Sequence, residues 1–260
     1  MAETSSKNKA LLSGEEEEDE RGDEGEELHL ELSLQKLNLG PKKKLLILGL
    51  GGFLCHRVFR YDRSKFPKRR TCPDASYGSF HVYKRPHCEE FIKFCLERFE
   101  VGIWSSAREW YMNNALDSIM IGLRGKLLFA WDQTECTRTC FFDLEKKERP
   151  IFLKELKKVW LLRTLTKFSS SNTLLIDKEP YKALLNPPHT AIFPNEYKAD
   201  DVEDGGFKCG SDLRLYLEKL AEAEDVPGFV KGNPFGKPAI SPRHPNWDFY
   251  SKIIRKYQRS

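Results

Sequence analysis

The sequence lacks the segments that direct proteins into membranes or across them. No apolar run approaches the ~20 residues of a membrane-spanning helix, and only 40% of the residues are hydrophobic. Ala10-Leu11-Leu12 is too short for the apolar core of a secretory signal, and the acidic run Glu15–Glu20 follows at once. A mitochondrial presequence is rich in Arg and poor in acids, unlike this N-terminus. We therefore expect no membrane association and a location in the nucleus or cytoplasm.

Paired cysteines and cysteine-based metal motifs are also missing. The chain has seven cysteines, an odd number, and they are scattered. Cys136 and Cys140 lie four residues apart, but no Cys-x-x-Cys or His-x-x-x-His pair completes a zinc site. The sequence therefore predicts reduced thiols and neither a disulfide framework nor a zinc centre.

Nucleotide-binding fingerprints are absent as well. Gly49-Leu50-Gly51-Gly52 begins like a dinucleotide-binding loop, but Leu54 stands where the third glycine is required. The phosphate-binding loop Gly-x-x-x-x-Gly-Lys does not occur. Neither type of nucleotide cofactor is expected.

Acidic and basic residues are unevenly distributed along the chain, although its net charge is only +4. Residues 1–41 hold twelve acidic and four basic residues, a net charge of −8, and the other 219 residues hold 39 basic and 27 acidic residues, a net charge of +12. Residues 1–27 have too few large apolar side chains to offset the entropy of ordering. We predict an acidic disordered leader over 1–41, a main folded domain over 42–200 and a helical extension over 201–260 that packs on it.

The end of the leader alternates leucine with polar residues from Leu28 to Leu34. This pattern is typical of an edge strand that packs on the body. It also resembles a plant repression motif, Leu-x-Leu-x-Leu, that docks corepressors as an extended peptide. Packing on the body is the favoured interpretation.

Buried apolar runs alternate with helical spacings along the body. This order predicts an α/β fold in which helices cover both faces of a parallel sheet. A basic insertion with short strands, over residues 55–83, follows the first strand and carries seven Lys or Arg residues from Arg57 to Arg70. The expected strands are 43–48, 101–104, 127–131, 173–176 and 190–193, and the expected helices start at Pro86, near Tyr111, at Phe152, near Tyr181, after Ser211 and at Trp247.

The basic insertion has two interpretations. It grips acidic or phosphorylated peptides, or it is an ordinary solvated hairpin, and the second is favoured. Nucleic-acid binding is not predicted for it, because no RNA- or DNA-reading motif is present.

In parallel sheets the chemistry lies at the carboxyl ends of the strands. Here those ends are Gly49–Phe53, Ser105-Ser106 and Asp177-Lys178. The surrounding motifs resemble the haloacid dehalogenase (HAD) superfamily, and within it the RNA polymerase II C-terminal-domain phosphatases, whose domain is also called the NLI-interacting-factor domain. The resemblance covers about residues 42–195 and is carried by Lys43–Leu54, Lys84-Arg85-Pro86, Val101–Ala107, Phe152–Leu156 and Leu174–Pro180.

The resemblance implies a Rossmann-like HAD fold and Mg²⁺-dependent dephosphorylation of phosphoserine or phosphothreonine. Active members carry Asp-x-Asp-x-Thr at the first motif, with the first Asp as nucleophile and the second as acid. Those positions are Gly49, Gly51 and Phe53 here, and glycine supplies neither group. At the last motif Asp177 remains as the sole metal ligand and Lys178 replaces the second one. We therefore expect no bound Mg²⁺ and no other cofactor.

Two supporting residues of the family site are retained. Ser105 matches the hydroxyl that binds the phosphoryl group, and Lys154 matches the lysine that neutralises its charge. With Lys178 they form a candidate phosphate pocket without turnover. In the alternative, which we favour for an idle site, Ser105 only ends a strand, and Lys154 and Lys178 are solvated or pair with Asp177.

The sequence thus predicts a pseudophosphatase that acts as a protein-binding or scaffold module, with a protein or phosphopeptide as partner. Three alternatives stay open. One is an active phosphatase with Ser105 or Asp177 as a replacement nucleophile. Another is a phosphatase-like subunit of the mitochondrial presequence translocase, although residues 1–41 show neither presequence nor anchor. The third is a nuclear adaptor that uses Leu28–Leu34. The oligomeric state is not indicated.

Overall fold

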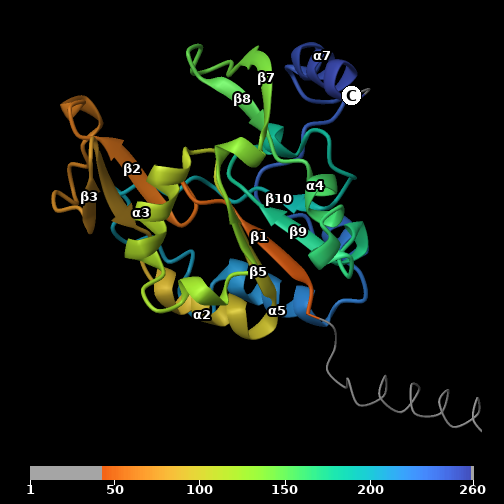
Figure 1. Cartoon of the computed structure of the whole chain (residues 1–260), viewed down its shortest axis with the longest axis horizontal. Helices are drawn as coiled ribbons and strands as arrows, with labels where there is room; N and C mark the ends of the chain where they lie inside the picture. The colour runs from red at the N-terminus through yellow and green to blue at the C-terminus, as the bar shows by residue number, and fades with distance from the viewer. Residues whose placement is uncertain (1–42, 259–260) are drawn as a thin grey trace, which may run out of the picture. The chain divides into compact units, whose positions relative to one another are not determined.

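A five-stranded parallel sheet forms the centre of the computed structural model, which describes residues 43–258. Its strand order is β10-β9-β1-β5-β6, and every neighbouring pair is parallel (Figure 1). The predicted α/β fold is therefore confirmed. The strands are β1 (Leu45–Leu48), β5 (Glu100–Trp104), β6 (Phe129–Trp131), β9 (Thr173–Ile176) and β10 (Ala191–Ile192).

The central strand β1 is apolar at every position because both of its faces are covered. Leu46 and Leu48 belong to one hydrophobic cluster, whereas Leu45 and Ile47 belong to another. This division follows from the two-residue period of a strand. The helices α2 (Cys88–Arg98), α3 (Glu109–Ile119) and α5 (Asp212–Glu222) contribute to the first cluster, and α4 (Leu156–Trp160) contributes to the second.

The predicted basic insertion after β1 is a three-stranded antiparallel sheet. Its strands β2 (Cys55–Phe59), β3 (Ala75–Tyr77) and β4 (Phe80–Lys84) take the order β2-β4-β3. A short 3₁₀ helix, η1 (Arg63–Lys65), lies between β2 and β3. Because β2 starts a few residues after β1, this small sheet stands beside the carboxyl end of the central sheet (Figure 1).

A second hairpin, β7 (Thr137–Phe142) with β8 (Pro150–Leu153), corrects the prediction of a helix from Phe152 to Trp160. The helix α4 begins only at Leu156. The spacing of Phe152, Leu156 and Val159 resembles a helix face, but Ile151 and Leu153 alternate with Phe152 as in a strand and are buried. Strand pairing with β7 therefore prevails over the apparent helical period.

Other boundaries differ by a few residues. In the central sheet, β6 begins at Phe129 and not at 127, and β10 is only Ala191–Ile192. The helix expected at Pro86 begins at Cys88, after His87 in the left-handed region at φ 57°. The segment near Tyr181 is a 3₁₀ helix, η6 (Pro180–Ala183). Further 3₁₀ helices are η2 (Arg124–Lys126), η3 (Gln133–Glu135), η4 (Arg163–Leu165) and η5 (Ser170–Asn172).

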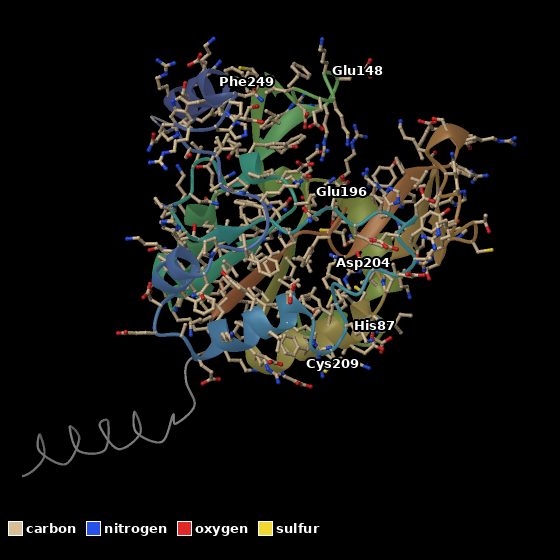
Figure 2. The ribbon with its side chains drawn as sticks, turned by 180° about the vertical axis from the view of Figure 1, so that it is seen from behind. His87, Glu148, Glu196, Asp204, Cys209 and Phe249 are labelled. Atoms are coloured by element: carbon tan, nitrogen blue, oxygen red, sulfur yellow. The ribbon has the colours of Figure 1, made fainter. Side chains whose placement is uncertain are left out.

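The C-terminal part contains α5, α6 (Val226–Gly232) and α7 (Trp247–Tyr257). Leu213 and Leu217 of α5 pack in the cluster that also holds α2. The helix α7 packs on the β7–β8 hairpin, because Phe249 lies 5.8 Å from Phe141 between ring centroids. Figure 2 shows Phe249 at the same end as this hairpin, whose turn carries Glu148.

The predictions for the leader, including the alternation from Leu28 to Leu34, fall on residues outside the described range. No helix within residues 43–258 is both long and apolar enough to cross a membrane.

Candidate functional site

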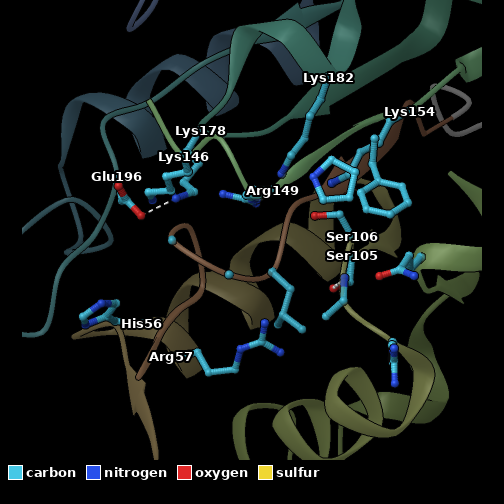
Figure 3. Close-up of a pocket in the computed structure, with 18 of the residues that line it drawn as sticks. His56, Arg57, Ser105, Ser106, Lys146, Arg149, Lys154, Lys178, Lys182 and Glu196 are labelled. Atoms are coloured by element: carbon cyan, nitrogen blue, oxygen red, sulfur yellow. Dashed lines mark hydrogen bonds and ion pairs between the residues drawn. The ribbon is translucent and has the colours of Figure 1, made fainter. Parts of the chain in front are cut away.

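The carboxyl ends of β1, β5 and β9 open into a cavity of about 570 Å³. Ser105, Lys154 and Lys178, the three residues of the predicted phosphate pocket, all line it, as does Gly51 (Figure 3). The topology brings them together because neighbouring parallel strands end at the same edge of the sheet. Lys154 arrives from a different direction, directly after β8.

The two glycines at the family's acid positions differ in the space around them. A Cβ atom at Gly49 would lie 3.0 Å from Oδ2 of Asp177 and 3.2 Å from the carbonyl oxygen of Ile176. A Cβ atom at Gly51 would meet nothing within 4 Å. A side chain at position 49 therefore requires Asp177 and the Ile176 carbonyl to give way by a few tenths of an ångström, whereas position 51 is open.

Asp177 is held by two ammonium groups. Its side chain is 2% exposed, and its Oδ2 atom lies 2.5 Å from Nζ of Lys154. Nζ of Lys182 lies 2.9 Å from Oδ1 and 3.1 Å from Oδ2. Burial by itself would raise the pKa of Asp177, but Lys154 and Lys182 outweigh it and hold that pKa well below its usual range. Asp177 is therefore a carboxylate with both oxygens occupied.

Lys182 was not anticipated from the sequence. It lies five residues beyond Asp177, in η6, and is 4% exposed. The 3₁₀ turn that begins at Pro180 places its ammonium group beside Asp177. Burial lowers the pKa of Lys182 to about 8, against the opposing effect of Asp177. The nearby charge of Lys154 lowers it further.

The donor set does not fit Mg²⁺. This ion requires several oxygen ligands, usually including carboxylates. Glycines occupy two of the family's positions, and the oxygens of Asp177 already accept hydrogen bonds from Lys154 and Lys182. Within residues 43–258, no three His, Cys, Asp or Glu side chains are grouped closely enough to hold a metal. The ammonium groups of Lys154 and Lys182 occupy the carboxylate oxygens of Asp177 that a metal ion would need as ligands.

Lys178 does not pair with Asp177, in contrast to the alternative arrangement predicted for it. Its ammonium group forms an ion pair with Glu196 and lies 3.4 Å from Glu179 (Figure 3). The side chain of Glu196 is 30% exposed, so this pair lies at the mouth of the cavity. Lys178 therefore lies at the mouth of the cavity, whereas Lys154 pairs with Asp177 at its base.

Ser105 directly follows β5 and is 4% exposed. Its Oγ atom accepts a hydrogen bond from the backbone N–H of Ala107 at 3.0 Å. No side-chain base among the described residues forms a hydrogen bond with this hydroxyl. Ser105 is thus placed to donate a hydrogen bond to an anion, and it has no partner that would activate it as a nucleophile.

Phe53, at the family's threonine position, belongs to the core and does not line the cavity. It is 1% exposed, and its ring makes edge contacts with Phe207 at 5.2 Å and Phe91 at 6.0 Å. The guanidinium of Arg85 lies 6.0 Å from the Phe53 ring centroid and 4.4 Å from that of Phe207. The aromatic side chain therefore serves packing.

The rim of the cavity is basic, and most of its residues were not singled out from the sequence. Two of the seven basic residues of the insertion, Arg57 and Lys65, line it. Others point elsewhere, since Arg60 binds the carbonyl of Gly78 and Arg70 pairs with Asp74. The β7–β8 hairpin and the start of α3 add the remaining rim residues, which are Arg108, Arg138, Lys146 and Arg149.

Two solved structures of Fcp1, an RNA polymerase II CTD phosphatase, are similar to this chain. The fission yeast protein bound to beryllium fluoride shares 11% identity at a TM-score of 0.41, and the match covers 87% of this chain and 65% of that chain. A second Fcp1 structure shares 14% identity at a TM-score of 0.41, with 87% and 64% covered. The chain thus spans less than two thirds of either structure.

No curated protein matches the chain. The model of the NLI interacting factor-like phosphatase family matches residues 44–227, which is more than half of the sequence. This match confirms the resemblance on which the expected fold and site rest. The chain belongs to the NLI interacting factor-like phosphatase family.

Proposed function

We propose that this chain is a catalytically inactive member of its phosphatase-like family that binds phosphoryl groups on a protein partner. The single observation that carries the proposal is the pairing of Asp177 with Lys154 and Lys182 beside Gly49. In this arrangement, two lysines of the chain itself pair with the last acidic side chain of the site.

Turnover by the family reaction requires a carboxylate nucleophile and an acid for the leaving oxygen. Gly49 and Gly51 offer neither group. Asp177 is a poor replacement nucleophile, because it is buried and both of its oxygens accept hydrogen bonds from ammonium groups. Ser105 lacks a base. These features support loss of the reaction.

The same features favour binding of an anion without a metal. The cluster of Asp177, Lys154 and Lys182 carries one net positive charge at the base of the cavity. Ser105 supplies a hydroxyl donor, and Lys178 stands at the mouth. A phosphoryl group brings a charge of about −1.5 to −2 and three strong acceptor oxygens, which this arrangement complements.

The partner that we propose is a protein with a phosphorylated side chain, in the nucleus or cytoplasm, so that the chain works as a binding or scaffold module. Its affinity for the phosphorylated segment is expected to be independent of Mg²⁺. This feature separates it from active members, whose metal is part of the site.

The test is binding of a phosphoserine peptide and of its unphosphorylated form to the full chain, with Mg²⁺ and with EDTA. We expect the phosphorylated peptide alone to bind, equally in both conditions, and Ser105→Ala and Lys178→Ala to weaken binding. Lys198→Ala, an exposed lysine that does not line the cavity, is the matched control. Equal binding of the two peptides, or hydrolysis of an aryl phosphate that is lost in Lys154→Ala, would contradict the proposal.

A further inference from the structure

The cavity holds more cations than one phosphoryl group requires. Nine of its lining residues are Lys or Arg, and Glu196 is the one carboxylate among them. A single phosphoryl group neutralises about two positive charges. The nine are Arg57, Lys65, Arg108, Arg138, Lys146, Arg149, Lys154, Lys178 and Lys182.

The nine cations fall into two groups by their partners. Lys154 and Lys182 pair with Asp177, Lys178 pairs with Glu196, and Lys65 lies 2.5 Å from Asp62. The other five have no carboxylate within 4.0 Å among residues 43–258, and their side-chain nitrogens donate no hydrogen bond to that part of the chain. These five, which we call the unpaired rim, are Arg57, Arg108, Arg138, Lys146 and Arg149.

The unpaired rim surrounds the cavity from separate elements. Arg57 comes from β2, Arg108 precedes α3, and the other three come from the β7–β8 hairpin and its turn. In Figure 3, Arg149 lies beside Lys178 and Lys182 on one side, and Arg57 lies on the other. The five residues therefore face a common space from several directions and do not form a row along a groove.

Like charges within this space repel one another. Arg149 is close enough to act electrostatically on both Arg57 and Lys182. Arg57 is also fixed in place, because its guanidinium lies 4.6 Å from the ring centroid of Phe80 and 5.3 Å from that of Tyr111. An anion with several charges would relieve the repulsion, and arginine is suited to it because its planar fork binds two phosphate oxygens at once.

We propose that the cavity binds a compact polyphosphate, a small molecule with several phosphoryl groups on one frame, of the inositol polyphosphate class. The inference rests on the proposed function for its inner subsite, where one phosphoryl group contacts Ser105 and Lys178. The unpaired rim holds the further phosphoryl groups, with Arg57 and Arg149 on opposite sides.

Beyond the inner subsite, the rest of the cavity suits a compact, highly charged ligand. Its volume of about 570 Å³ lies within the range of small-molecule sites. Of the twenty lining residues only four are apolar, namely Leu50, Ala107, Pro150 and Phe152. A segment with one phosphoserine uses only the inner subsite and leaves the unpaired rim without an anionic partner, whereas a polyphosphate presents acceptor oxygens over its whole surface.

The test is calorimetric titration of the full chain with inositol hexakisphosphate and with inositol 1-phosphate, at physiological ionic strength and with EDTA. We expect one hexakisphosphate per chain, bound at least about 100-fold more tightly than the monophosphate, because each added charged contact contributes about tenfold or more. Arg57→Gln and Arg149→Gln should each weaken hexakisphosphate binding by about tenfold. Lys147→Gln, an exposed lysine of the same turn that does not line the cavity, should leave it unchanged.

Equal affinity for the two inositol phosphates, or an equal loss in Lys147→Gln, overturns the inference. If the phosphoserine peptide binds through Ser105 and Lys178 while hexakisphosphate does not bind, the inference fails and the proposed function stands. If neither binds, both fail. Tighter binding of a peptide with two adjacent phosphoserines than of hexakisphosphate also overturns it, because the ligand is then a multiply phosphorylated protein.

The polyphosphate ring can be a free metabolite or a lipid headgroup. Sedimentation with vesicles that carry phosphatidylinositol bisphosphate separates these sources. Binding to the vesicles that is lost in Arg149→Gln supports the inference with the headgroup as ligand. Binding of soluble hexakisphosphate without sedimentation supports it with the free molecule as ligand.

Discussion

Nζ of Lys182 lies 2.9 Å and 3.1 Å from the two carboxylate oxygens of Asp177, so a lysine of the same chain binds the acidic residue that follows β9. Lys154 approaches Oδ2 of the same carboxylate at 2.5 Å. The position that holds a metal-binding carboxylate in active family members thus holds a carboxylate that pairs with two buried ammonium groups here.

Removal of the central carboxylate should destabilise the fold far more than removal of one ammonium group. Asp177→Asn leaves Lys154 and Lys182 as two buried cations without a counter-charge, and we expect a loss of about 3–5 kcal/mol. Lys182→Met leaves one neutral pair, Lys154 with Asp177, and we expect a smaller loss. Urea denaturation of both variants measures the difference, and a larger loss in Lys182→Met would refute the described arrangement.

The stability contributed by Lys182 should depend on pH in the alkaline range. Its pKa in the folded chain, about 8, lies below its ordinary value of 10.5. Between these two pH values Lys182 is protonated in the unfolded chain and neutral in the folded chain. The free energy of unfolding therefore rises with pH in this range. The wild-type free energy of unfolding minus that of Lys182→Met is therefore expected to increase from pH 8 to pH 10. A difference that stays flat or falls contradicts the lowered pKa of Lys182.

Restoring the family's acids should have opposite structural effects at the two glycines. Gly51→Asp introduces a side chain into open space and is expected to leave the melting temperature close to wild type. Gly49→Asp forces a second carboxylate against Asp177, with the new Cβ 3.0 Å from Oδ2, and should cost about 1–3 kcal/mol. Thermal denaturation of the pair compares them directly. Equal melting temperatures would show that position 49 accommodates a side chain as readily as position 51.

Restoring threonine at position 53 should destabilise the chain without adding function. Phe53 contacts the rings of Phe91 and Phe207 in the core, and loss of a buried phenylalanine ring costs about 3–5 kcal/mol. Phe53→Thr is compared by urea denaturation with Phe59→Thr, at an exposed aromatic position of the insertion. Similar losses in the two variants would contradict the packing role of Phe53.

The sequence predicted the centre of the fold because local pattern and tertiary burial agree there. The continuous apolar run of β1 is buried on both faces, and α7 and β9 have the bounds that their residues indicate. The β7–β8 hairpin was missed because the spacing of Phe152, Leu156 and Val159 also satisfies a helix. Only the pairing of Pro150–Leu153 with β7, the other strand of the hairpin, decides between the two.

The candidate site was predictable at its strand ends and not beyond them. Ser105 and Lys178 follow buried strands, so their place at the edge of the sheet follows from topology. Lys182 reaches Asp177 through the turn of η6, which no periodic pattern reports. Arg149 enters the site only because the hairpin folds back over it, and the hairpin itself was not anticipated.

The most direct test of the central claim is phosphate release from a phosphoserine peptide under single-turnover conditions, with the full chain in excess and Mg²⁺ present. We expect no release above that of the peptide alone, in the wild type and in Gly51→Asp, while the wild type still binds the peptide in EDTA. Phosphate release that requires Mg²⁺ and disappears in Asp177→Asn or in Ser105→Ala would contradict the account.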